Sequence, residues 1–131
     1  MILNAIEVRV KIDEDFYEDE VCFVFPHPTR EWDCLTITWN YETLTSTQEN
    51  SRIWVSRRMP FYSGCSGIER LLLRRNEVAI VFTRQLAESL ELECELSIVF
   101  DVDDAVFGQL SLAFSRIFDG CGQYIDESKG P

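Results

Sequence analysis

Alternation of apolar and polar residues is the feature that most constrains how this chain of 131 residues can fold. A period of two predicts a β-strand with one buried side and one solvent-facing side. The clearest example begins at Ile6, where apolar residues at 6, 8, 10 and 12 alternate with charged residues. Six further segments with this pattern, or with a short apolar run, predict strands at 21–25, 35–41, 52–57, 68–74, 77–83 and 95–100.

Two segments follow helical spacing instead. A short helix is expected over residues 84–90, with Thr83 as its N-terminal cap. A longer helix is expected over residues 103–118, where seven apolar side chains form one stripe at helical spacing. These elements predict an α+β fold, in which an antiparallel sheet of about seven strands packs against a C-terminal amphipathic helix. The length predicts a single domain over residues 1–131 with a frayed tail at about 123–131.

The charge of the chain limits the partners that it can bind. There are 23 acidic and 12 basic residues, which gives a net charge of −11. Such a chain repels nucleic acid, because binding a phosphate backbone depends on Lys and Arg. It is instead attracted to basic protein surfaces. The basic residues gather in the middle, at residues 52–84, so attraction between segments of the same fold also explains the pattern.

No sequence motif indicates catalysis, a cofactor or a membrane segment. His27 is the one histidine, and neither a metal-binding nor a phosphate-binding motif is present. We therefore predict no catalytic residue, no metal site, no cofactor and no enzymatic activity. Residues 1–13 lack the pattern expected of a secretory signal, and no apolar run is near the roughly 18 residues of a membrane span. Five irregularly spaced cysteines are typical of reduced thiols in the cytoplasm, and Cys22 is expected in the core.

An acidic segment at residues 13–20, with the sequence DEDFYEDE, is the first candidate for binding a partner. It is interpreted either as a solvated loop or as a docking surface for a basic protein. The two aromatic residues in its middle favour docking, because aromatic residues are enriched in protein interfaces. The candidate binding residues of this segment are Asp13, Glu14, Asp15, Phe16, Tyr17, Glu18 and Asp19.

A second candidate lies at residues 52–62, where arginines and aromatic residues alternate. If Ile53 and Val55 face the core, Trp54 points outward. Trp, Tyr and Arg are the residue types most enriched at binding hot spots, so the candidates here are Trp54, Arg57, Arg58 and Tyr62. The alternative is a partly buried Trp54 covered by arginine side chains. The acidic flanking segments argue against single-stranded nucleic acid as the ligand.

The order of features over residues 54–118 resembles the tenth numbered immunity-protein family of bacterial polymorphic toxin systems. The features in question are an aromatic strand, a glycine-containing turn, two strands, a short helix, a strand with acidic residues after it, and a closing amphipathic helix. In the sequence they are Trp54-Val55-Ser56, residues 62–69, 71–73 and 78–82, Leu86-Ala87, LSIVFDVDD at 96–104, and Arg116-Ile117-Phe118. The resemblance implies a small, cytosolic, non-enzymatic protein that neutralises a toxin encoded beside it.

Two functions remain open from the sequence. The first is a toxin-neutralising immunity protein, whose partner would be a cognate protein toxin such as a basic nuclease domain. The second is a non-enzymatic adaptor or chaperone-like module that serves a secreted effector. Neither requires nucleic acid or a membrane as partner, and the sheet edges together with the odd number of cysteines leave a homodimer open.

Overall fold

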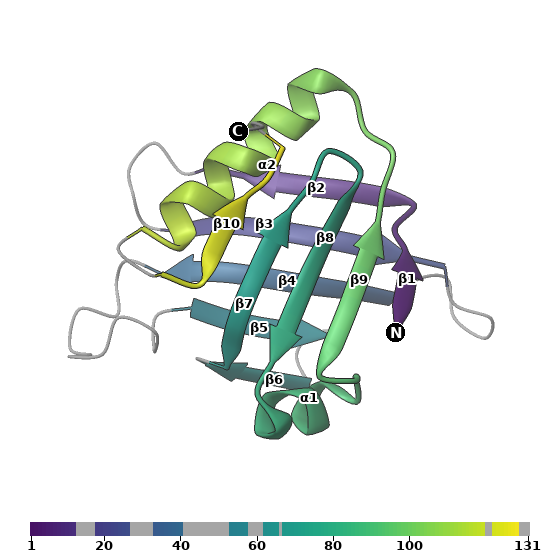
Figure 1. Ribbon diagram of the computed structural model, residues 1–131, viewed down its shortest axis with the longest axis vertical. Helices are drawn as coiled ribbons and strands as arrows, with labels where there is room; N and C mark the ends of the chain where they lie inside the picture. Colours follow the sequence, from purple (N-terminus) through teal and green to yellow (C-terminus); the bar gives the residue numbers. More distant parts are fainter. Residues whose placement is uncertain are drawn as a thin grey trace.

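The computed structural model describes residues 1–12, 18–26, 33–40, 53–57, 62–65, 67–119 and 122–128. In this part of the chain, two five-stranded sheets pack face to face, with their strands crossing (Figure 1). The alternation in the sequence produces this arrangement, because each sheet has one apolar face that must be covered. Neither described helix is long and apolar enough to cross a membrane.

Sheet B is an antiparallel meander formed by the first half of the chain. Its strands are β2 (Glu7–Lys11), β3 (Glu18–Phe25), β4 (Asp33–Asn40), β5 (Ile53–Arg57) and β6 (Tyr62–Cys65). They are hydrogen-bonded in the order β2-β3-β4-β5-β6, so every strand pairs with its neighbour in sequence.

Sheet A is formed by strands from the middle of the chain, with the first and the last described strands at its two edges. Its strands are β1 (Ile2–Asn4), β7 (Ile68–Leu73), β8 (Glu77–Phe82), β9 (Glu95–Val99) and β10 (Tyr124–Asp126). They are hydrogen-bonded in the order β1-β9-β8-β7-β10. The three central strands are antiparallel, whereas each edge strand is parallel to its neighbour.

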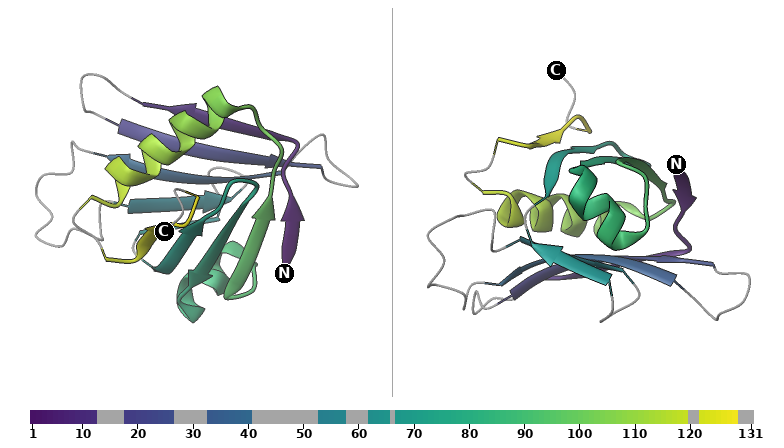
Figure 2. Two further views of the ribbon diagram at one scale, coloured as in Figure 1. Left: turned by 45° about the horizontal axis from the view of Figure 1, so that its top comes forward. Right: turned by 90° about the horizontal axis from the view of Figure 1, so that it is seen from below.

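The two described helices begin at side-chain caps. The α1 helix (Arg84–Leu90) begins after Thr83, whose hydroxyl accepts a hydrogen bond from the amide of Leu86 at 3.2 Å. The α2 helix (Asp104–Ile117) begins after Asp103, whose carboxylate accepts from the amide of Val106 at 2.8 Å. Both caps satisfy amide groups that have no partner in the first helical turn. The α2 helix contacts β2, β3 and β10 and fills one side of the space between the sheets (Figure 2).

A single cluster of buried side chains joins both sheets and both helices. The rings of Phe23 on β3 and Phe114 on α2 stack near its centre, with centroids 6.4 Å apart. Burial on this scale is the main favourable contribution to folding. The largest side chains in the cluster that are fully buried are Phe23, Phe82, Phe114, Leu35, Ile37, Leu71, Leu73, Ile80, Leu90, Leu96, Ile98 and Leu110.

The predicted α+β class and the C-terminal helix are confirmed, but the expected single sheet of about seven strands is wrong. The strands divide between two sheets, and three short ones were not predicted: β1, β6 and β10. Alternation shows that a strand has one buried face, but it does not show what covers that face.

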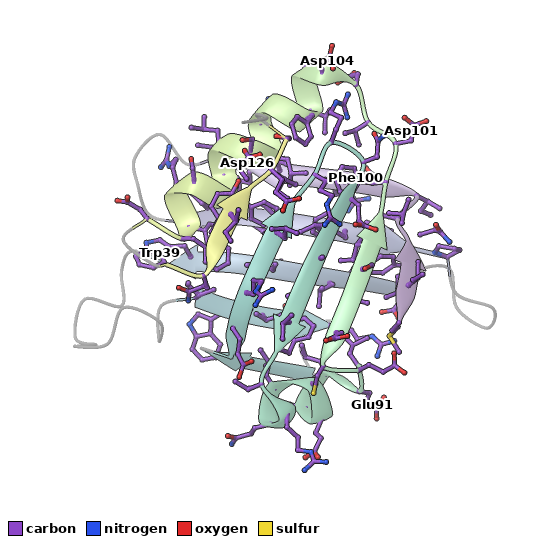
Figure 3. All side chains as sticks on the ribbon, viewed as in Figure 1. Trp39, Glu91, Phe100, Asp101, Asp104 and Asp126 are labelled. Carbon is purple, nitrogen blue, oxygen red and sulfur yellow. The ribbon has the colours of Figure 1, made fainter. Side chains whose placement is uncertain are left out.

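The expected frayed tail at 123–131 is corrected over residues 123–128, because β10 has contacts on both sides; residues 129–131 lie outside the described part of the chain. Its backbone pairs with β7, and its Asp126 carboxylate accepts a hydrogen bond from the Ser111 hydroxyl of α2 at 2.8 Å (Figure 3). The Tyr124 ring packs against Phe114 and Phe118, and burial raises the pKa of its hydroxyl well above the usual range.

Candidate protein-binding face

The outer face of sheet B is the side directed away from sheet A, and no described helix or strand lies over it (Figure 2). Alternation along each strand assigns side chains to this face, because their neighbours in sequence point into the core. The described side chains on this face are Glu7, Arg9, Lys11, Glu20, Cys22, Val24, Cys34, Thr36, Thr38, Trp54 and Ser56.

Trp54 is the described aromatic residue on this face. It is 42% exposed, while Ile53 and Val55 on either side are buried in the core. The side chain therefore points outward, in the direction that the alternation predicts. A large exposed aromatic ring on a sheet surface is the type of side chain that anchors protein interfaces.

One row of cross-strand neighbours connects Trp54 with the acidic segment. Trp54 lies opposite Thr38 on β4, and Thr38 lies opposite Glu20 on β3. Because adjacent strands are about 4.8 Å apart, the backbones of Trp54 and Glu20 are separated by about 10 Å. Glu20 of the acidic segment and Trp54 of the second candidate segment thus lie on the same face, at the same end of sheet B.

The predicted residues of the acidic segment are described only in part. The backbone of Glu18 pairs with that of Asn40 at the start of β3. The backbone of Tyr62 pairs with that of Arg57 in sheet B. The remaining predicted residues lie outside the described part of the chain: Asp13, Glu14, Asp15, Phe16, Tyr17 and Arg58.

Arg57 is not a surface residue, which corrects its prediction as a binding residue. Its guanidinium forms an ion pair with Asp33 at 3.1 Å and donates to the backbone carbonyls of Leu90 and Glu91 at 2.9 Å each. Glu91 follows α1 in a left-handed conformation (Figure 3). Arg57 therefore joins sheet B to the C-terminal end of α1, where a cation is favoured by the helix dipole.

Asp19 is likewise part of the interior, and its prediction as a docking residue is wrong. It has 0% exposure, and its carboxylate lies 3.0 Å from the Arg116 guanidinium of α2. Alternation explains why Asp19 is buried and Glu20 is not, because odd-numbered residues of β3 face the core and even-numbered residues face outward. A buried charge is tolerated when it is paired in this way.

The centre of the outer face is lined by small side chains. Thr36, Cys34 and Ser56 are buried, and Cys22 is half-buried. Cys22 thus lies on this face and not in the core, contrary to expectation. Burial raises the pKa of its thiol, with the adjacent Cys34 contributing. A raised pKa makes a thiol a poorer nucleophile, so Cys22 is not a favourable residue for cysteine catalysis.

The contribution of Thr36, Thr38 and Glu20 to the surroundings of Trp54 was missed from the sequence. The signal for the threonines was present, because they occupy the polar positions of an alternating strand. What the sequence does not reveal is the pairing that places β4 between β3 and β5. Strand order depends on contacts between residues far apart in sequence.

The comparisons with known proteins give no identification, since no family model and no curated protein matches the chain. Among the residues that the structure describes, no group of three or more His, Cys, Asp or Glu is placed to hold a metal ion.

Proposed function

We propose that this chain is an immunity protein, which binds a cognate bacterial toxin through the outer face of sheet B and neutralises it. The observation that carries the proposal is the exposed Trp54 in the same cross-strand row as Glu20. An interface of this kind combines an aromatic anchor with an adjoining acidic surface. The resemblance of residues 54–118 to an immunity-protein family supports the same function.

The charges on this face indicate which part attracts the partner. On β2, the Arg9 guanidinium pairs with Glu7 at 3.0 Å, and Lys11 lies opposite Glu20. These described charges largely compensate one another. The acidic segment that leads into β3 carries further carboxylates in the sequence, among them Asp13, Glu14 and Asp15, which lie outside the described residues.

Attraction and anchoring would have separate kinetic effects. The acidic segment would steer a basic partner toward the face and raise the association rate. Trp54 would lose water on contact and slow dissociation. A toxin with a basic cleft for nucleic acid is a partner of this class, because an acidic protein seated on such a cleft excludes the substrate. Neutralisation then requires contact only, without a chemical step.

The proposal is tested with the protein encoded by the gene next to that of this chain. We expect the two proteins to co-purify and the toxin to lose its activity in the complex. The Trp54→Ala variant should bind about 30-fold more weakly through faster dissociation, since a hot-spot residue contributes at least about 2 kcal/mol. The matched control is Leu112→Ala on α2, where a side chain that is 51% exposed lies away from this face.

Three results would contradict the proposal. The first is the absence of binding in the micromolar range or tighter. The second is an equal effect of the Trp54→Ala and Leu112→Ala variants, which would place the interface elsewhere. The third is a complex in which the toxin remains active, which would instead identify the adaptor or chaperone-like module.

A further inference from the structure

The outer face of sheet A is a second exposed sheet surface, on the opposite side of the molecule from the outer face of sheet B (Figures 1 and 2). No described element lies over it. The residues that face outward are those between the buried positions of each strand. The central strand is β8, with two strands on either side.

An apolar row crosses this face from one edge to the other. Ile125 on β10 lies opposite Leu72, followed by Ala79 on β8, Ser97 on β9 and Ile2 on β1. The two isoleucines at the ends are conspicuous, since Ile2 is 70% exposed and Ile125 is 48% exposed. Apolar side chains aligned across an open sheet face favour contact with another apolar surface.

A charged row runs beside the apolar row and has opposite signs at its two ends. Arg70 on β7 lies opposite Val81 on β8, and Val81 lies opposite Glu95 on β9. Both charged residues are exposed, and neither forms an ion pair with any described residue. Two other carboxylates belong to these strands: Glu77, which is already paired with Arg74 at 2.6 Å, and Glu69, which is exposed next to Arg70.

Both rows are arranged symmetrically about β8. A two-fold axis that runs along β8, between two facing copies of the sheet, would superimpose the β7 side of one copy on the β9 side of the other. The strand directions agree with this operation, because β7 and β9 are both antiparallel to β8 and each edge strand is parallel to its neighbour. Arg70 of each copy would then face Glu95 of the other, and Ile125 would face Ile2.

The geometry points to a homodimer in which the outer faces of two sheets A pack against each other around this axis. An interface with a two-fold axis must be complementary to itself, and this face has that property. The near balance of its charges also matters in a chain of net charge −11. Two copies can approach here without the repulsion that their acidic surfaces would produce elsewhere.

The size of the face predicts a weak dimer. Five strands about 4.8 Å apart and three to six residues long cover roughly 350–400 Å². A standard stable interface buries about 800 Å² on each partner. We therefore expect a dissociation constant in the micromolar range, with the two Arg70–Glu95 contacts deciding the register.

Charge exchange at the two ends of the charged row tests this dimer. The self-association of the full chain is measured by analytical ultracentrifugation, and folding of each variant is checked by circular dichroism. Arg70→Glu places two glutamates in contact in each half of the dimer, and Glu95→Arg places two arginines there. Each variant is expected to raise the dissociation constant at least tenfold. The control is Arg84→Glu, on the exposed side of α1, which should leave the constant unchanged.

An equimolar mixture of the two variants is the decisive sample. In the mixed dimer, both contacts again join a glutamate to an arginine, so we expect association to return to the wild-type level. An Arg–Glu contact restored within a single chain cannot explain this result, because each chain still carries only one changed residue. A wild-type chain that stays monomeric at about 1 mM would overturn the inference. So would a dimer that is insensitive to both changes, or a mixture that fails to associate. These outcomes leave the proposed toxin binding unaffected, since it uses the other sheet.

Discussion

At the scale of single residues, burial decides what a charge does in this protein. Asp19 and Glu20 are adjacent in an acidic segment, yet alternation places Glu20 on the outer face and Asp19 in the interior beside Arg116. The two members of that ion pair are 97 positions apart in the sequence. The sequence showed the charges and the alternation, but not the partner that would accept the inward carboxylate. Arg57 presents the same problem, since its residue type suggested a surface binding residue, whereas folding places it beside the buried Asp33.

Removing the Arg57 guanidinium should therefore affect stability directly. In the Arg57→Met variant the apolar stem is kept, but Asp33 and the carbonyls at the end of α1 lose their donor. Loss of one member of a buried pair should lower the free energy of unfolding by about 3 kcal/mol. Urea denaturation measures this value. The matched variant Arg84→Met removes an exposed arginine and should unfold like the wild type, and equal stability of all three proteins would contradict the structural role of Arg57.

At the scale of elements, the sequence predicted what is local and missed what is not. The α1 helix has the expected bounds and cap, and β2, β4, β7, β8 and β9 lie within a residue or two of the alternating segments. The unpredicted strands β1, β6 and β10 have three or four residues, too few to show a period. Two of them, β1 and β10, form by parallel pairing with β9 and β7, respectively. No local sequence pattern reveals a pairing of this kind.

Two glycines give opposite predictions for these elements. Gly108 lies on an exposed position within α2, and a methyl group there would meet no atom within 4 Å. Gly108→Ala should raise the free energy of unfolding by about 0.5–1 kcal/mol through helix propensity. Gly67 has a φ of 141°, and an added Cβ would lie 2.8 Å from the Leu86 side chain. Gly67→Ala should therefore lower the same quantity, by about 1–3 kcal/mol.

Thermal and urea unfolding of both alanine variants beside the wild type measure this difference. The carbonyl of Gly67 accepts a hydrogen bond from the Thr83 amide at 2.7 Å, so strain at this position should also reach the start of α1. Stabilisation by Gly67→Ala, or destabilisation by Gly108→Ala, would show that the surroundings of these glycines differ from those described.

At the scale of the whole molecule, the two outer faces are on opposite sides and differ in character. The outer face of sheet B exposes Trp54 beside Glu20, whereas the outer face of sheet A has an apolar row beside a row with Arg70 at one end and Glu95 at the other. Because each face belongs to a different sheet of the same core, occupation of one leaves the other open. If both proposals hold, a dimer formed through sheet A presents two toxin-binding faces that point away from each other.

This arrangement predicts the composition of the complex. Above the dissociation constant of the dimer, light scattering should give the mass of two chains with two toxin molecules. The Arg70→Glu variant should give one chain with one toxin at the same concentration. Titration calorimetry should find the same affinity per site in both cases, since residue 70 does not lie on the outer face of sheet B. One toxin per dimer, or weaker toxin binding by Arg70→Glu, would mean that the two faces do not act independently.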